Sequence, residues 1–255
     1  MIIDVNASLG NWPFQRFALR TAGQLDRHFA GLGIDQAWVS SADAILCPDI
    51  DACDEELAKH LRTYPRLRMV PTINPVLANW SKSLDKWAGR GVHAVKVYPN
   101  YHQYSLSSPM MCEVARQVAS RRMVLQVQMR VEDERGMYAP LRISGVSVED
   151  VAKLAQNVPE AAIIALCPYY REAVQLAAKA PKVMVDLSFI EACDTVKTLL
   201  RDVPAGRVVF GSHTPFLCTR AELMKIEAAK VTQRELRRIR EANVRSLFSL
   251  SVDTK

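Results

Sequence analysis

Three polar side chains near the start of the chain have a spacing that could build a reactive site. Asp4, Asn6 and Ser8 alternate with apolar residues in IIDVNASLG, residues 2–10. Successive side chains of a β-strand point to opposite faces, so all three lie on the same side. A polar row on an otherwise apolar strand is either a wet sheet face or the floor of a site.

Seven further apolar runs also end in polar residues. If all eight runs are parallel strands, their carboxyl ends meet at one edge of the sheet and these side chains form a polar ring, which we call the crown. Besides Asn6 and Ser8, the crown contains Ser40, Ser41, Thr72, Asn74, Lys96, Tyr98, Gln126, Gln128, Arg130, Cys167, Asp186, Ser188, Ser212 and His213.

The expected proton-transfer groups are His213, Asp186 and Asp4. Imidazole titrates near neutral pH, so His213 at a strand end, with Asp186 beside it, is suited to acid–base work. Asp4 could act as a base or could orient a polar group of a neighbouring strand. A hydrogen-bonded structural role is the alternative reading of His213.

Two cations and a thiol complete the reactive candidates. Lys96 must find an anion or lose its charge inside an apolar strand, and Arg130 can clamp a carboxylate, so both are expected to bind a substrate carboxylate. An internal ion pair with Asp4, Glu132 or Asp186 is the alternative. Cys167 could be a nucleophile next to His213 or an inert buried thiol.

The remaining expected substrate contacts are neutral. Asn6 and Gln126 would orient a carbonyl group or a water molecule, and Ser8, Tyr98 and Gln128 would line the same crown. Trp12, in the NWPF loop of residues 11–14 after the first run, is either an apolar wall for a flat substrate or packing on the rim.

Strand-like runs that alternate with helical segments predict the fold. The runs are 2–8, 36–41, 67–73, 93–99, 123–129, 161–167, 183–189 and 208–213, with helices expected at 22–32, 51–63, 80–90, 109–121, 147–157, 170–179, 194–202, 220–230 and 232–249. This rhythm over 255 residues predicts an α/β protein, a (β/α)8 TIM barrel forming one domain over residues 1–255. The main competitor, a doubly wound open sheet, usually has a Gly-rich turn after its first strand. Residues 2–8 and 208–213 should then pair and close the barrel.

Composition and charge indicate where the protein is found and which kinds of partner it binds. The chain is 49% hydrophobic and has no leading basic and apolar segment or long apolar run, so a cytoplasmic protein without a membrane partner is expected. The net charge is +6, but the basic run at 234–240 is read as a solvated helix face, so no nucleic-acid partner is expected. The six cysteines form no C-x-x-C pair, and His28, His60 and His102 are expected at the surface.

Four short motifs resemble the amidohydrolase-related family of TIM barrels. They are I-D at the first strand, GVHAVKVYP at 91–99, VVFGSHTPF at 208–216 and N-x-R-x-L-F at 243–248. That family includes metal-dependent hydrolases, lactonases and non-oxidative decarboxylases. The resemblance covers essentially the whole chain and implies a small carboxylic-acid substrate and, by analogy, a homodimer.

This chain departs from the family at each metal position. The family's two first-strand histidines correspond to Asn6 and Ser8, further histidines fall near Gln126 and Cys167, and the eighth-strand aspartate corresponds to His213. Amide and hydroxyl oxygens bind zinc poorly, so we expect no family-type zinc and no cofactor. The sequence therefore predicts a metal-independent hydrolase, or a lyase or decarboxylase, with a catalytically inactive ligand-binding or structural relative as the alternative.

Overall fold

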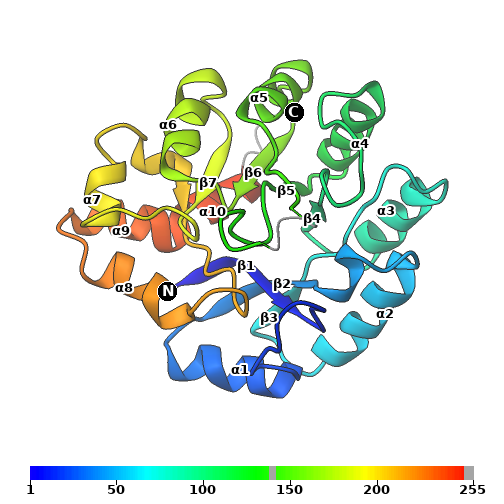
Figure 1. Cartoon of the computed structure of the whole chain (residues 1–255), viewed down its shortest axis with the longest axis horizontal. Helices are drawn as coiled ribbons and strands as arrows, with labels where there is room; N and C mark the ends of the chain where they lie inside the picture. The colour runs from blue at the N-terminus through cyan, green and yellow to red at the C-terminus, as the bar shows by residue number, and fades with distance from the viewer. Residues whose placement is uncertain (138–141, 250–255) are drawn as a thin grey trace.

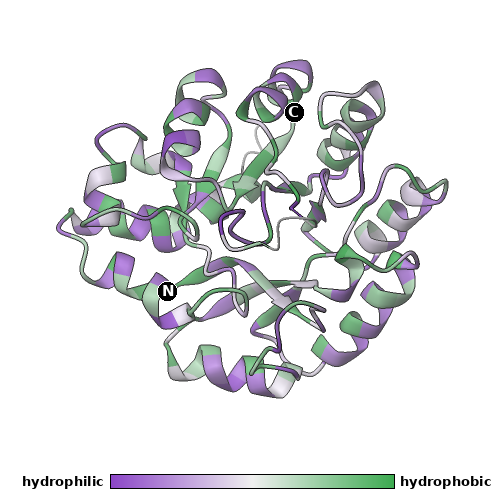
Figure 2. Cartoon of the chain, in the orientation of Figure 1, coloured by the Kyte–Doolittle hydropathy of each residue, from purple (hydrophilic) through white to green (hydrophobic). Residues whose placement is uncertain are grey.

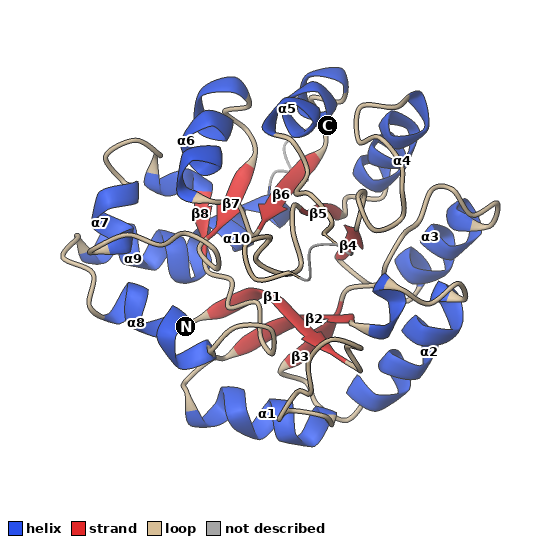
Figure 3. Cartoon of the chain, viewed as in Figure 1, coloured by secondary structure: helices blue, strands red, loops and turns tan. Residues whose placement is uncertain are grey.

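The computed structural model is a ring of eight parallel strands surrounded by helices (Figures 1 and 3). It describes residues 1–137 and 142–249, so the expected domain of residues 1–255 extends beyond the described part. The strands are β1 (Ile3–Leu9), β2 (Gln36–Ser41), β3 (Leu67–Met69), β4 (Ala94–Val97), β5 (Val124–Gln128), β6 (Ala162–Leu166), β7 (Met184–Asp186) and β8 (Val208–Val209). The predicted α/β barrel is confirmed.

Hydrogen bonds at two seams close the barrel. The ladders run β1-β2-β3 and β4-β5-β6-β7-β8. Between β3 and β4, the Ile73 amide donates to the Lys96 carbonyl at 2.9 Å. Between β8 and β1, the Val5 amide donates to the Phe210 carbonyl at 3.0 Å, and the Ser8 amide donates to the Thr214 carbonyl at 2.7 Å. The expected pairing of residues 2–8 with 208–213 is therefore present.

The helices cover the outer face of the strands because each carries one apolar stripe. They are α1 (Ala22–Gly31), α2 (Ile50–Leu61), α3 (Trp80–Gly89), α4 (Pro109–Ser120), α5 (Val148–Asn157), α6 (Tyr170–Lys179), α7 (Thr195–Leu199), α8 (Thr219–Glu227), α9 (Gln233–Arg237) and α10 (Asn243–Ser249). Figure 2 shows mostly hydrophobic strands, whereas the helices alternate hydrophobic and hydrophilic residues. Leu25 and Phe29 of α1 are fully buried against the strands, which is typical of amphipathic helices around a core.

The last expected helix, 232–249, is present with an interruption. A π-helical segment, η4 (Arg238–Ala242), joins α9 to α10. Thr232 and Glu235 form a capping box at its start, where the Thr232 hydroxyl accepts from the Glu235 amide at 3.2 Å. No helix among the described residues is long and apolar enough to cross a membrane.

The ladders of β7 and β8 end earlier than the sequence predicted, and side chains bond backbone groups beyond the ends of β6 and β8. A carboxylate oxygen of Asp4 accepts from the Ser212 amide at 2.9 Å, and one of Asp186 accepts from the Cys167 amide at 2.7 Å. Cys167 and His213 have φ angles of 58° and 52°, in the left-handed region that residues with a Cβ seldom adopt. The side chains of the crown therefore hold the backbone just beyond the strand ends.

Replacing Gly211 tests this packing. A Cβ atom at Gly211 would lie 2.5 Å from Oδ2 and 2.9 Å from Cβ of Asp186. We expect Gly211→Ala to lower the free energy of unfolding by about 1–3 kcal/mol, since overpacking a filled interior forces neighbours to move. Urea unfolding measures the change.

Gly89→Ala is the matched control. Nothing lies within 4 Å of the Cβ built at Gly89, which ends α3. Alanine is the better helix former, so this variant should unfold at the same or a slightly higher urea concentration. Equal stability of the two variants would contradict the close contact between Gly211 and Asp186.

Candidate active site

A buried lysine lies at the centre of the crown. The Lys96 ammonium, on β4, donates to Oδ1 of Asn6 on β1 at 3.1 Å, and Lys96 is only 1% exposed. Nδ2 of Asn6 donates in turn to Oδ2 of Asp186 on β7 at 2.9 Å. The Asn6 amide thus links an internal cation to an internal carboxylate.

Lys96 does not form the direct internal ion pair that was the alternative to a substrate-binding role. Among the described residues, no carboxylate lies within the 4.0 Å ion-pair distance of its ammonium. Burial lowers the pKa of Lys96 from 10.5 to about 8, while the charges of Cys167, Asp186 and Asp4 act in the opposite direction. Burial likewise raises the pKa of Asp186. With a pKa of about 8, Lys96 is mostly protonated at neutral pH, so it is a buried cation with an amide rather than a carboxylate in contact.

Asp4, on β1, is held by its own strand and by the neighbouring segment after β8. Oδ1 accepts from the amides of Asn6 and Ser212 at 3.0 and 2.9 Å, and Oδ2 accepts from the Ser212 hydroxyl at 2.5 Å. Burial raises the pKa of Asp4 to about 6, although these hydrogen bonds favour its ionised form. Asp4 can therefore change its protonation near neutral pH, and it also ties β1 to the segment after β8.

His213 differs from the expectation for an acid–base residue. Its Nε2 lies 2.7 Å from the Val131 carbonyl, which only accepts, so Nε2 carries the proton. Its ring stacks on Phe216, and burial lowers the pKa of His213 to about 3. The side-chain partners of the Asp186 carboxylate are Asn6 and Ser188, so the expected His213–Asp186 pair does not form.

Arg130 also differs from its expected role. Its guanidinium donates to both oxygens of Glu172, at 2.7 and 2.6 Å, and lies 3.8 Å from the Tyr169 ring centroid. It is therefore in the alternative state, an internal ion pair, but with Glu172 rather than with the three expected acids. Glu172 was missed; its Oε2 also accepts from the Tyr169 amide at 2.7 Å, at the start of α6.

Cys167 is held as a buried thiol. Nδ2 of Asn6 and Nε2 of Gln128 lie 3.2 and 3.0 Å from its sulfur, and the Ser188 hydroxyl lies at 3.2 Å. Burial raises its pKa, and no hydrogen bond to His213 is present among the described contacts of its sulfur. This favours the inert reading over the nucleophile.

The neutral crown residues are also bonded within the chain, but some keep unused acceptors. The Ser40 hydroxyl lies 3.3 Å from both the Ser8 and the Tyr98 hydroxyls. Nε2 of Gln126 donates to the Val5 carbonyl at 2.8 Å across the barrel. Among the described residues, Oε1 of Gln126, Oε1 of Gln128 and Nδ1 of His213 are buried without a partner.

Aromatic rings close the mouth above the crown. Trp12 is buried and packs edge-to-face on Phe216 and Tyr101, at centroid distances of 5.4 and 6.0 Å. A pocket of about 290 Å³ lies beside them at the carboxyl ends of the strands, lined among others by Ser188, Phe189 and Phe216. Ser188 connects the pocket to the interior, since its hydroxyl donates to Asp186 at 2.8 Å.

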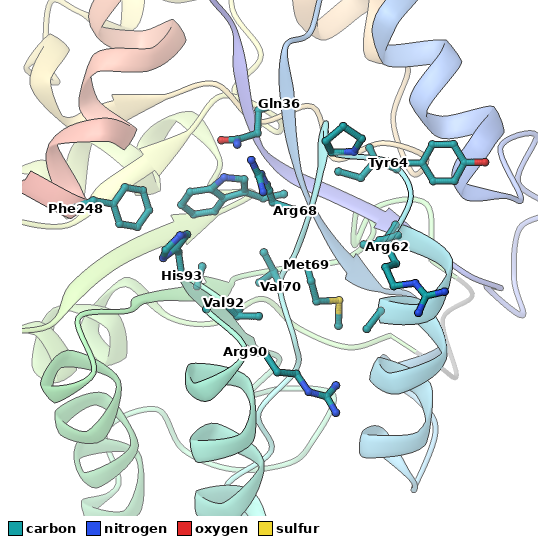
Figure 4. A pocket seen from close by; sticks show the side chains of 17 residues that line it. Gln36, Arg62, Tyr64, Arg68, Met69, Val70, Arg90, Val92, His93 and Phe248 are labelled. Carbon is teal, nitrogen blue, oxygen red and sulfur yellow. The ribbon is translucent and has the colours of Figure 1, made fainter.

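A second pocket, of about 400 Å³, lies at the amino ends of the strands (Figure 4). In Figure 4 the guanidinium groups of Arg62 and Arg90 point away from His93 and Phe248. Arg90 is paired with Glu55 at 2.8 Å. Because active sites of such barrels lie at the carboxyl ends of the strands, the pocket beside Ser188 is the candidate site.

The crown does not fit the metal that the resemblance implies. Among the described residues, no three His, Cys, Asp or Glu side chains are grouped to hold a metal ion. The Asn6 oxygen already accepts from the Lys96 ammonium, and a metal ion there would meet a fixed positive charge. Burial keeps the Cys167 thiol protonated, whereas a thiolate is needed for ligation.

Lys96→Met tests the buried charge. Because the folded pKa of about 8 lies below 10.5, the stability from this group is greatest at high pH and is lost as pH falls through about 8. Between pH 10 and pH 7 the wild-type free energy of unfolding should fall by about 2–3 kcal/mol more than that of the variant. Urea unfolding across this range measures the difference. Lys59→Met, at a side chain that is 71% exposed, should keep the wild-type pH profile, and coincident profiles for wild type and Lys96→Met would contradict the assignment.

Comparisons with known proteins agree on the architecture. No protein-family model and no curated protein matches the sequence. A 2,6-dihydroxybenzoate decarboxylase from Rhizobium is 12% identical, with a TM-score of 0.71 over 98% of this chain and 99% of that one. A dihydroxybenzoic acid decarboxylase from Polaromonas, with bound manganese and the inhibitor 2-nitroresorcinol, is 13% identical, with a TM-score of 0.74 over 98% and 97%.

A 5-carboxyvanillate decarboxylase from Sphingomonas paucimobilis is 11% identical, with a TM-score of 0.72 over 97% of this chain and 98% of that one. At such identities the likeness carries the fold and leaves the chemistry to the residues of the site. This chain has the (β/α)8 barrel fold of the amidohydrolase-related decarboxylases.

Proposed function

We propose that this protein is a metal-independent enzyme of the amidohydrolase type that acts on a small aromatic carboxylic acid, as a decarboxylase or a hydrolase. One observation carries the proposal: the Lys96 ammonium, held by Asn6, is a fixed cation in the crown. An ammonium group inside the barrel can attract the carboxylate of a substrate at neutral pH. Decarboxylases for aromatic acids among those neighbours favour this substrate class.

Two side-chain oxygens of the crown that lack donors could bind hydroxyl groups of the same substrate. The side-chain oxygens of Gln126 and Gln128 lie on β5 and lack hydrogen-bond donors among the described residues. A hydroxylated aromatic acid brings both a carboxylate for Lys96 and hydroxyl protons for these oxygens. Phe189 and Phe216 at the mouth offer flat apolar surfaces for its ring.

Asp4 is the proton donor of this proposal. In a decarboxylation the bond from the ring carbon to the carboxylate breaks, carbon dioxide leaves, and the same carbon takes up a proton. Asp4, with a pKa of about 6, is partly protonated near neutral pH and recovers its proton from solvent. His213, with its pKa near 3, is left as a hydrogen-bonding residue.

A catalytically inactive relative is the second candidate, and two observations favour it. Most crown side chains are bonded to one another, and Trp12 with Phe216 covers the mouth. The pocket beside Ser188 is also lined by Glu132, Asp133 and Glu191 against one cation, Arg135, which is itself paired with Asp133. This acidic rim disfavours the entry of an anion.

Binding of 2,6-dihydroxybenzoate separates the two candidates. We expect wild type to bind it in isothermal titration calorimetry, and Lys96→Met to bind it at least tenfold more weakly, because the charge for the carboxylate is removed. Lys59→Met should bind like wild type. Failure of wild type to bind this compound, benzoate or 5-carboxyvanillate at millimolar concentration would favour the inactive relative.

Metal removal tests the independence from metal. After mild dialysis without a chelator we expect less than about 0.2 equivalent of zinc or manganese by elemental analysis, since the donor set is poor. The protein is then treated with EDTA. Conversion of a bound acid, followed by chromatography of the products, should proceed at the rate of the untreated protein. Activity that is lost with EDTA and restored by manganese would refute metal independence.

A further inference from the structure

A continuous chain of side-chain hydrogen bonds connects the barrel interior to the helical layer. From Oδ2 of Asp4 it runs to the Ser212 hydroxyl at 2.5 Å and to the Thr214 hydroxyl at 2.6 Å. It continues to the Thr219 hydroxyl at 2.6 Å and ends at Nε2 of His28 at 2.7 Å. Four consecutive contacts at the short end of the hydrogen-bond range join β1, the segment after β8, α8 and α1.

Burial isolates the middle of this chain from water. Ser212, Thr214 and Thr219 are 0%, 1% and 3% exposed. His28, in contrast, is half-buried in the last turn of α1, which lies beside α8 in Figure 1. The expectation that His28 is a surface residue is thus only partly met, because its Nε2 faces inward to Thr219. The row of hydrogen-bonded side chains thus begins at Asp4, among charged interior groups, and ends at His28, within reach of solvent.

The chemistry of the five side chains suits proton transfer. Each hydroxyl can donate one hydrogen bond and accept others, so the chain can be oriented in either direction. With Asp4 ionised, every donor points toward Asp4, from Nε2–H of His28 through Thr219, Thr214 and Ser212. With Asp4 protonated, every donor points toward His28. Both ends are titratable groups, and imidazole is the side chain that most often shuttles protons.

We infer that Ser212, Thr214 and Thr219 form a proton relay that exchanges protons between Asp4 and solvent through His28. A proton from solvent binds Nδ1 of His28, and Nε2 gives its proton to Thr219. Each hydroxyl passes its own proton to the next oxygen, and Ser212 delivers the last one to Oδ2 of Asp4. One N–H bond breaks, one O–H bond forms at Asp4, and His28 is left neutral with its proton on Nδ1.

The surroundings of the two ends are compatible with this movement. The charged groups that act on Asp4 are Asp186, from β7, and Lys96, from β4. The Asp186 charge favours protonated Asp4 and the Lys96 charge favours ionised Asp4, so the two effects oppose each other. At His28 the perturbing influence is burial, which keeps the ring mostly neutral and ready to release a proton inward. The relay needs no opening of the aromatic mouth and does not depend on the reaction proposed above.

The experiment follows the protonation of Asp4 in time. After a rapid jump from pH 8 to pH 5, the infrared carbonyl band of protonated Asp4 is recorded, with its assignment made by its absence from Asp4→Asn. In wild type the band should appear as fast as the two solutions mix. In Thr219→Val, which keeps the shape but removes the hydroxyl, its rate should fall at least tenfold while its final amplitude stays similar.

Three further variants make the result specific. Thr219→Ser restores a hydroxyl and should recover the wild-type rate. His28→Gln should slow the band like Thr219→Val, and it tests the relay if the buried variant fails to fold. His60→Gln, at an exposed histidine on α2, should leave the rate unchanged. Wild-type rates in both Thr219→Val and His28→Gln, failure of Thr219→Ser to restore the rate, or the absence of any Asp4 band between pH 8 and pH 5 would overturn the relay.

Discussion

The burial of one ammonium group organises the interior of this barrel. An isolated charge in an apolar medium is strongly unfavourable, so Lys96 requires polar groups around it. Asn6 supplies the direct contact, and the same amide holds Asp186, which in turn binds the Ser188 hydroxyl and the Cys167 amide. Strands β1, β4, β6 and β7 are therefore connected through a network that begins at one lysine.

The same polar network also closes the barrel. Asp4 bonds both the amide and the hydroxyl of Ser212 across the seam between β1 and β8, and Gln126 reaches the Val5 carbonyl across the interior. Groups that could act on a substrate thus also determine where the strands lie. Close to these bonds, Cys167 and His213 adopt left-handed backbone conformations after the ends of β6 and β8.

The structural neighbours show how much chemistry one architecture can carry. Their barrels superpose on this chain over nearly its whole length, and one of them contains manganese. In this chain the amide of Asn6 stands where the resemblance places a metal ligand, and it holds the Lys96 ammonium, so a positive charge is part of the polypeptide itself.

The sequence by itself determined the architecture and the members of the crown. Strand and helix periodicities depend on near neighbours in the chain, so the eight runs and their alternation with helices could be read directly. The alternation of Asp4, Asn6 and Ser8 likewise placed all three on one side of their strand. The strand ends and the π-helical segment Arg238–Ala242 were not predicted, because both depend on contacts with distant segments.

Tertiary structure alone decided which crown residues are free to react. The partner of Arg130 is Glu172, 42 positions away, and the amide that holds Lys96 is 90 positions away. The orientation of His213 depends on a carbonyl 82 positions away, and His28 meets Thr219 across 191 positions. Hydrogen bonding and burial set the pKa and availability of each group, and both arise only when distant segments pack, which no local pattern in the sequence records.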